Sequence, residues 1–532
     1  MDFGRLFRHG RTRLKERSLK FSTLILAMGG ILSKILGLIR QWLMALLFGT
    51  SVATDSWLMA SIIPALLFEI IGGSFNIVMI PLLSRHVQVE EGPEGTTGFL
   101  SEIFSWIVVL TSLMMLPLEI FAPQLVHLIA PGFNGPRQPL TVLLLRVMLP
   151  AGPFLVLGNF MNGVLQSKKL FIGSALTPVI INMVRILTMI VLGLSMGIIG
   201  VAIGFTLAQM AQLLYLVPAL RRQHIHLKLR LHMQHPWTRL YFKLAIPNIV
   251  SHSVQIGGTI IDRIFASTLA VGRISGLNFS QVISQLPIGL VVTPIVTPIY
   301  TRLSELFNQD GNSSTYQNVV RQGLQLTLLV VSPFVVTLFL LRVPLVEILY
   351  QHGRFNHNAT ALTARLLGYW TIGILGTAIN ILFSRILFSQ KATRTMSLIA
   401  MATMGVNILG DFLLIGPLRA AGLALATSLA AWFRVFAMAM WLRWHNVHPW
   451  RWHRRFFVGW IVSMMIFTAA MAASTRVIYA AHIAHWSFEL ILIGGFSAMA
   501  WILYGVSLTR FKIIPSALSH LGRWMKKSFP RN

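Results

Sequence analysis

Long apolar segments follow one another along almost the whole chain, and they decide what this sequence can fold into. A helix needs about 20 mostly apolar residues to cross a bilayer, and fourteen stretches meet this length. Inside a bilayer, backbone N–H and C=O groups must bond to one another, so such stretches fold as helices. We therefore predict an all-α polytopic membrane protein with about 14 transmembrane helices. The stretches cover residues 22–48, 56–84, 100–122, 140–165, 171–195, 198–220, 240–268, 274–301, 321–341, 362–389, 395–416, 420–442, 456–476 and 485–509.

Composition supports this class and excludes several kinds of site. Of the 532 residues, 55% are hydrophobic and 11% are charged, whereas soluble domains carry about 25% charged residues. The sequence holds no cysteine, which excludes disulfides, zinc thiolates and thiol nucleophiles. The histidines between residues 221 and 239 lack nearby carboxylates, so we expect neither a metal site nor a cofactor.

The net charge of +29 is concentrated in four basic clusters. With fourteen crossings all four lie on one face, which the positive-inside rule identifies as cytoplasmic. We therefore expect both termini in the cytoplasm, contacts with anionic membrane lipids and no binding of nucleic acid. The clusters are Arg5, Arg8, Arg11, Arg13, Lys15, Arg17 and Lys20; Arg221, Arg222, Lys228 and Arg230; Arg451, Arg454 and Arg455; and Arg523, Lys526 and Lys527.

The first span is unusual because it carries charges. Lys34 and Arg40 lie about two turns apart within it, and Asp55 follows after a Gly-Thr-Ser turn. An ionisable side chain at the bilayer centre costs roughly 2.5 to 3.5 kcal/mol on insertion scales, so these cations should face a watery or anionic interior. We interpret residues 33–64 as the floor of a cation-lined cavity, with an ion pair between Lys34 and Asp55 as the structural alternative.

The same stretch recurs in the second half of the chain. Three landmarks, an Arg, a Gly and a Pro, recur 223 positions later (40 to 263, 49 to 272 and 64 to 287). Gln-Ser-Lys at 166–168 meets Ser-Gln-Lys at 389–391 at this offset, and GVAIGFTLA from Gly200 meets GLALATSLA from Gly422 at 222. A match held over so long a span indicates an internal repeat.

The repeat predicts two six-helix lobes around a central cavity, plus two extra helices at the carboxyl end. Six is an even number, so both lobes start on the same side and should be parallel copies. The predicted parts are a basic cytoplasmic amino terminus (1–20), an N-lobe (21–220), a basic cytoplasmic linker (221–239), a C-lobe (240–443), two further spans (444–510) and a basic cytoplasmic tail (511–532). We expect the linker to form an interfacial helix.

Other ionisable residues lie inside predicted spans. Arg263 could supply a cation from the second lobe, with Asp262 beside it on the helix. Ser33, Arg146 and Arg385 are possible secondary contacts, although an arginine near a helix end can also extend to the membrane surface.

Six blocks together resemble the MurJ/MviN family of lipid II flippases, which belongs to a superfamily with multidrug and oligosaccharidyl-lipid exporters. Their order and spacing extend over nearly the whole chain. The blocks are SKILGLIRQWLMALLFGTSVATDSW from Ser33, LIAPGF from Leu128, NGVLQSKKLFIGSALTPVIIN from Asn162, IDRIFASTLAVGRISGLNFSQ from Ile261, YQHGRF from Tyr350 and IGPLRAAGLALATSLAAW from Ile415.

The resemblance implies a transporter, not an enzyme, in a bacterial cytoplasmic membrane. It implies that undecaprenyl-diphosphate-linked peptidoglycan precursor moves from the inner to the outer leaflet by alternating access, driven by a coupling ion or the membrane potential. Cavity cations would hold the diphosphate, and the family positions in the first span fall on Lys34, Arg40 and Asp55. Two family arginines are absent: one falls within Leu67-Phe68, and the other at Val282, after Gln281.

Three alternatives remain beside this prediction. A sister flippase for another polyprenyl-diphosphate-linked glycan, of the capsule, exopolysaccharide or O-antigen type, is favoured by the two missing arginines. A cation-coupled drug antiporter would need a cluster of carboxylates inside the membrane, but Asp55, Glu69, Asp262 and Asp411 are scattered along the chain. A glycosyltransferase would need a loop carboxylate pair, and the only loop cluster, Glu90 to Glu94, has the composition of a solvated turn.

Overall fold

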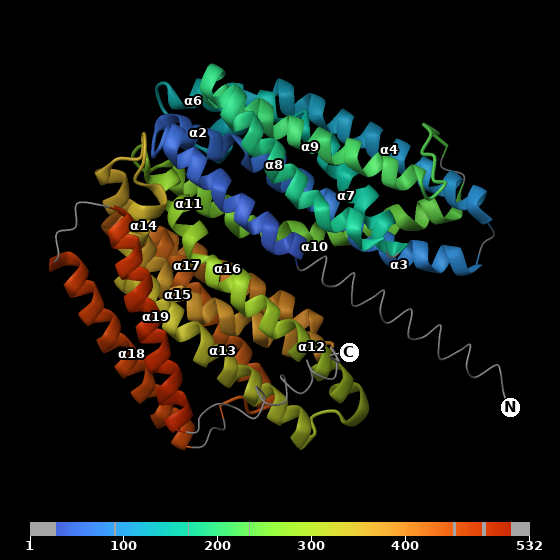
Figure 1. Cartoon of the computed structure of the whole chain (residues 1–532). Helices are drawn as coiled ribbons and strands as arrows, with labels where there is room; N and C mark the ends of the chain where they lie inside the picture. Colours follow the sequence, from blue (N-terminus) through green and yellow to red (C-terminus); the bar gives the residue numbers. More distant parts are fainter. Residues whose placement is uncertain are drawn as a thin grey trace. The chain divides into compact units, whose positions relative to one another are not determined.

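The computed structural model describes residues 28–89, 92–168, 170–232, 235–450, 454–480 and 486–511. Every regular element in these ranges is a helix, as expected for a polytopic membrane protein (Figure 1). The chain divides into two compact units, residues 1–275 and residues 276–532. The basic clusters at the two ends of the chain lie outside the described residues.

The first unit consists of the first helix and the elements up to α10. In it α7 packs against α3 and α9, and α8 packs along α9. Its elements are Met28–Phe48, α2 (Val52–Ala60), η1 (Ile63–Leu67), α3 (Phe68–Val89), α4 (Gly92–Ile120), α5 (Ala122–Ile129), α6 (Arg137–Met148), α7 (Ala151–Ser167), α8 (Phe171–Met196), α9 (Ile198–Arg221) and α10 (Pro236–Ser267).

The second unit begins within α11 and repeats the pattern. Here α15 packs against α13 and α17, α16 packs along α17, and α18 and α19 form a further pair. Its elements are α11 (Arg273–Ser284), η2 (Ile288–Val292), α12 (Thr293–Asp310), α13 (Ser314–Leu340), α14 (Arg342–Tyr350), α15 (His357–Ser389), α16 (Thr393–Leu418), α17 (Ala420–Trp444), α18 (Arg454–Ala480) and α19 (Trp486–Arg510).

In the described residues, every predicted span coincides with one or more helices. In the described ranges, eleven helices are long and apolar enough to cross a membrane, or twelve if α6 and α7, bent by 41°, form one broken span. The two remaining predicted spans coincide with α10 and α19, which have 32 and 25 residues but are not among those twelve. The polytopic all-α fold is therefore confirmed, whereas the number fourteen stays a prediction.

The internal repeat is visible in the backbone. Gly49 and Gly272, which are 223 positions apart, both have positive φ, at 57° and 82°. Gly197 and Arg419, 222 positions apart, have φ of 62° and 54° and form the N-caps of α9 and α17. Because few residues adopt positive φ, matching positions in the two halves show that the repeat extends to local structure.

The repeat also places the same irregularity in two spans. Each span contains a five-residue π-helix: η1 includes Pro64, and η2 directly follows Pro287. Proline lacks a backbone N–H and disturbs the α-helical bonding pattern, and π-helical turns in proteins often mark functional positions. The equivalent prolines therefore account for equivalent breaks.

The predicted interfacial helix between residues 221 and 239 is wrong for residues 225–232, which form no helix. This segment lies along α4, where the N–H groups of Lys228 and Arg230 donate to the hydroxyls of Ser101 and Ser105. The apolar residues of the segment alternate with polar ones, a period-2 pattern that favours an extended chain. The next helix, α10, begins at Pro236.

Candidate functional site

Two arginines inside the first unit influence each other electrostatically. Arg40, on the first helix, and Arg185, on α8, lie close enough for their guanidinium charges to repel each other. Both are half-buried. The Arg185 guanidinium stacks 4.4 Å from the ring centre of Phe205, and its Nε has no hydrogen-bond partner among the described residues. Two neighbouring cations with an unfilled donor form a site that favours an anion.

Contacts between the first helix and α8 hold these arginines in place. The Asn182 side-chain amide donates to the carbonyl and the hydroxyl of Ser33, at 3.2 and 3.1 Å. A Cβ on Gly29 would lie 2.7 Å from the Ala175 carbonyl oxygen. The close approach of the two helices therefore requires a glycine there. The predicted secondary residue Ser33 thus has a positioning role, and Lys34 is exposed beside it.

Asp55 has a role that the sequence did not indicate. Its side chain is fully buried, and its two carboxylate oxygens accept hydrogen bonds from the N–H groups of Gly272 (2.6 Å) and Ser275 (2.9 Å). A carboxylate at the start of a helix satisfies backbone donors and complements the helix dipole. Asp55 therefore caps the first turn of α11. It also joins two repeat-related turns, the one after the first span, near Gly49, and the one after α10, at Gly272.

Arg263 belongs to a group of charges around Asp55. It is half-buried on α10, and the carboxylates of Asp262 and Asp55 are close enough to stabilise its charge. Arg137 is also near Asp55, and its Nη1 donates to the Leu269 carbonyl at 3.1 Å. The predicted residues Asp55, Asp262 and Arg263 therefore form one group of charges in the first unit, and Arg40 forms another with Arg185.

The two other predicted arginines have separate surroundings. Arg146, on α6, lies with its Nε 3.9 Å from the Glu119 carboxylate, and both side chains are exposed. Arg385, on α15 of the second unit, is exposed and stacks 5.3 Å from the ring centre of Tyr300. Of the arginines in the first lobe, the predicted site included Arg40 and Arg146 but not Arg185. The signal was the 3-4 spacing of polar residues on α8, which puts Asn182 and Arg185 on one face.

The places of the two missing family arginines are occupied by uncharged residues. Phe68 is fully buried, and its ring occupies the space that a Cβ on Gly152 would need. A core aromatic ring therefore stands where the resemblance implies a cation. In the second unit, Gln281 and Val282 are half-buried on α11.

A cavity of about 290 Å³ lies between α3, α7, α8 and α9. Nine of its twelve lining residues are polar, which is unusual inside a membrane helix bundle, and we name it the amide pocket. Asn159 donates to the Glu69 carboxylate at 3.2 Å, and Thr177 donates to the Asn162 side-chain oxygen at 3.3 Å. The lining residues are Glu69, Asn76, Leu155, Asn159, Asn162, Gln166, Ser174, Thr177, Pro178, Ile181, Gln209 and Gln212.

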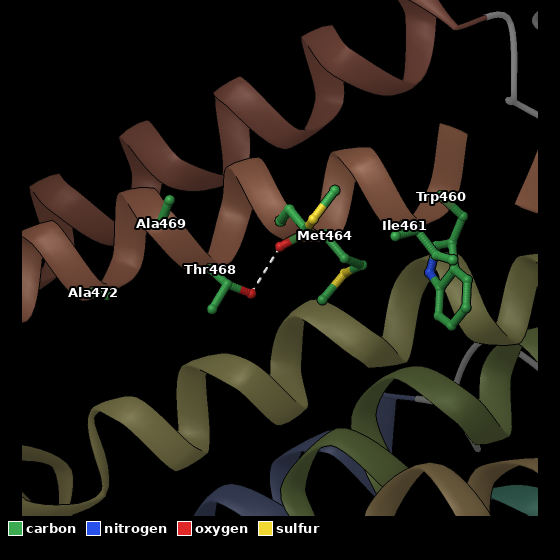
Figure 2. Close-up of a pocket in the computed structure, with 7 residues that line it drawn as sticks. Trp460, Ile461, Met464, Thr468, Ala469 and Ala472 are labelled. Atoms are coloured by element: carbon green, nitrogen blue, oxygen red, sulfur yellow. Dashed lines mark hydrogen bonds between the residues drawn. The ribbon is translucent and has the colours of Figure 1, made fainter. Parts of the chain in front are cut away.

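A second cavity, about 560 Å³, is a groove on α18 (Figure 2). Its lining is apolar apart from Trp460 and Thr468, whose hydroxyl donates to the Met464 carbonyl of its own helix. The groove has no charged lining residue, so it cannot neutralise an anion. Such a surface on a membrane helix is suited to hydrocarbon chains.

Comparisons with known proteins identify the family. The family model described as lipid II flippase MurJ matches residues 44–495. A probable lipid II flippase MurJ from Rickettsia prowazekii is 25% identical over 421 residues, which cover 78% of this chain and 82% of the relative. The lipid II flippase MurJ from Burkholderia cenocepacia is 25% identical over 453 residues, which cover 83% and 87%.

Solved structures show the same fold. A lipid II flippase MurJ in an inward closed conformation superposes with a TM-score of 0.77 at 24% identity, over 92% of this chain and all of that one. An inward-facing multidrug transporter of the MATE family superposes with a TM-score of 0.63 at 12% identity, over 79% and 97%. With a family match over most of its length and the fold of these transporters, the chain belongs to the MurJ family of lipid II flippases.

Proposed function

We propose that this chain carries undecaprenyl-diphosphate-linked peptidoglycan precursor, lipid II, from the inner to the outer leaflet of a bacterial cytoplasmic membrane. The observation that carries the proposal is the set of interior cations in the first unit, above all the neighbouring Arg40 and Arg185. Charged residues inside a membrane are costly, so an anion-binding role accounts for their presence. Lys34 and Arg263 complete the proposed set.

The chemistry of the step follows from the substrate's charge. A diphosphate cannot cross hydrocarbon without replacing its hydration, and fixed cations supply that replacement. Arginine binds a phosphate through two parallel N–H bonds, whereas lysine acts as a point charge. The polyprenyl tail can remain in the lipid while the head group crosses. The apolar groove on α18 offers a surface for such a chain.

Alternating access requires contacts that form in one state and break in another. The hydrogen bonds of Asp55 with Gly272 and Ser275 join two repeat-related turns. We propose that they hold the outer end closed while the diphosphate is loaded from the cytoplasmic side. Outward movement of an anion is favoured by a membrane potential that is negative inside, by about 2.3 kcal/mol per charge per 100 mV. The potential, or a coupled ion, could therefore drive the cycle.

A flippase for another polyprenyl-diphosphate-linked glycan, of the capsule, exopolysaccharide or O-antigen type, is the second candidate. The observation that favours it is Phe68, a buried ring where the family resemblance implies an arginine. If the chain is a lipid II flippase, Arg185 on α8 supplies the charge of the missing family arginine. If it is a flippase for another glycan, the altered set of cations binds a different head group.

Replacement of the essential lipid II flippase in a bacterial host tests the proposal. We expect this chain to support growth after the host protein is depleted. Arg40→Ala should abolish growth at normal membrane abundance, whereas Arg146→Ala, the same change at an exposed arginine, should not. Growth by wild type and Arg40→Ala alike would refute the cation site. Failure of the wild-type chain, together with restored capsule export in a capsule-flippase mutant, would establish the second candidate.

A further inference from the structure

The amide pocket contains more polar groups than its fold requires. By the 223 offset, Asn159 corresponds to Leu382 in the second unit, and by the 222 offset Gln209 corresponds to Ala431. Leu382 is fully buried in that unit's core. The second copy therefore folds with apolar residues at these two positions, so Asn159 and Gln209 call for another explanation.

One acceptor in the amide pocket is unfilled. Gln209 is 4% exposed, and its Oε1 has no hydrogen-bond partner in the described part of the chain. A buried amide oxygen without a donor costs about 1 to 3 kcal/mol, and such groups are rare in folded proteins. A ligand that brings a donor into the cavity would remove this cost.

The wall of the amide pocket on α8 shares a helix face with Arg185. Ser174, Thr177, Pro178 and Ile181 line it from α8, and their 3-4 spacing continues along the same stripe to Arg185. Ile181 and Arg185 are four residues apart, or about 6 Å along the helix axis. A group that enters the pocket would therefore lie next to a diphosphate held by Arg40 and Arg185.

The volume and the polar lining of the amide pocket indicate which class of ligand fits it. The volume of about 290 Å³ is close to ten times the ~30 Å³ share of one water molecule and lies at the lower end for small organic ligands. The cavity is too large for a bare ion and large enough for one ring. Side-chain amides donate and accept, and carboxylates accept, which suits hydroxyl and N-acyl groups that do both.

We propose that the amide pocket binds the first sugar of the lipid-linked glycan, the one attached directly to the diphosphate. This inference rests on the proposed function. Asn159, Asn162 and Gln209 hydrogen-bond its hydroxyl and N-acyl groups, and Glu69 accepts from a hydroxyl. Glu69 is exposed within a membrane-spanning element, so it should face the aqueous path, not lipid. Its charge repels acidic sugars, which makes the pocket selective for a neutral N-acylated sugar.

The test measures how much a sugar adds to the binding of a polyprenyl diphosphate. The full-length protein in lipid nanodiscs is titrated with undecaprenyl diphosphate, with the same lipid carrying one N-acetylated hexosamine, and with the same lipid carrying one hexuronate. We expect the hexosamine to raise affinity by about tenfold, the gain from two hydrogen bonds. The hexuronate should give no gain.

The variants separate the amide pocket from the arginine site. Gln209→Leu and Asn159→Leu should each remove most of the gain from the hexosamine and leave undecaprenyl diphosphate binding unchanged. Arg185→Gln should weaken both lipids by the same factor. The matched control is Asn358→Leu, at an exposed amide in the first turn of α15, which should change neither. Should Gln209→Leu fail to fold, Asn159→Leu, at a half-buried position, carries the test.

Each remaining outcome is decisive. An undiminished gain from the hexosamine in both amide variants would overturn the sugar subsite and leave the proposed function intact. Thermal stabilisation by sodium that Glu69→Gln abolishes, without any gain from sugar, would replace the subsite with a cation site. Binding of neither lipid by the wild-type protein would refute the proposed function together with the subsite.

Discussion

The two halves of the molecule share one backbone pattern but present different chemistry at matched positions. In the first unit, α7 and α9 carry Asn162 and Gln212 in the wall of the amide pocket. By the 223 and 222 offsets, the second unit has Arg385 and Arg434 at the corresponding places on α15 and α17. The matching glycine turns and π-helices show that the scaffold is common to both.

The comparison of the two copies separates the features of the scaffold from the features of the site. Features present in both copies, such as the breaks at Pro64 and Pro287, serve the helix architecture. Features present in one copy, such as Arg185, whose position 223 residues later is Ile408, are free to serve a substrate. A duplicated transporter can thus keep two structural copies and specialise the chemistry of one.

If the two copies are parallel, matched loops should lie on the same side of the membrane. Because the sequence has no cysteine, single cysteines can report this directly. A membrane-impermeant thiol reagent should label cysteines at Asn134 and His357 from outside and leave those at His226 and Arg443 unlabelled in intact cells. Labelling of His226→Cys from outside would mean that the copies, or the termini, are oriented differently.

Cations in the two copies should contribute unequally to diphosphate binding. Arg185→Gln removes a charge-assisted contact worth about 1.5 to 3 kcal/mol, so affinity should fall roughly tenfold to hundredfold. Arg385→Gln should reduce affinity less than threefold, because that guanidinium stacks on Tyr300. Titration with undecaprenyl diphosphate measures both. Equal losses would indicate that the two copies share the site equally.

The two copies also differ at the position of Asp55, because Asn278 occupies the matching position 223 residues later. Asp55→Asn makes the copies alike, but an amide has one acceptor oxygen for the two N–H donors of Gly272 and Ser275. Loss of charge and of one bond should weaken the contact by about 1 to 3 kcal/mol. We expect impaired transport at normal abundance and faster thiol labelling of a cysteine at Ser51. Unchanged transport and labelling would argue against a gating role.

The smallest expected effect concerns matched N-caps with positive φ. Arg419 has φ 54° and ψ −129°, a region that suits glycine, whereas Gly197 already fits it. Non-glycine residues held there cost about 1 to 3 kcal/mol. Arg419→Gly should therefore raise thermal stability, and Gly197→Ala should lower it, as measured by unfolding in detergent. If both changes lowered stability, the Arg419 side chain would be contributing contacts that outweigh the strain.

The sequence predicted the helices well because apolar length determines membrane spans. It predicted the repeat because glycines and prolines recur wherever the backbone must turn or break. It failed for residues 225–232, where hydroxyls of α4 satisfy the backbone of an extended segment. Such partners, more than 120 positions away in the chain, leave no local signal.

For the site, the sequence located charges but not their partners. Lys34, Arg40, Asp262 and Arg263 stand out because charges are rare in apolar segments. The bonds of Asp55 to Gly272 and Ser275 join residues more than 200 positions apart, so only the fold reveals them. The amide pocket went unnoticed because its uncharged polar residues come from four helices and form no motif in any one of them.

A transport measurement tests the central claim most directly. Lipid II is delivered to the cytoplasmic leaflet of vesicles containing the purified protein, and a soluble hydrolase on the opposite side reports its arrival there. We predict that the wild-type protein exposes lipid II to the hydrolase, that Arg146→Gln does so equally, and that Arg40→Gln combined with Arg185→Gln does not. Equal exposure with the doubly substituted protein would contradict the claim that these two arginines carry the diphosphate across the membrane.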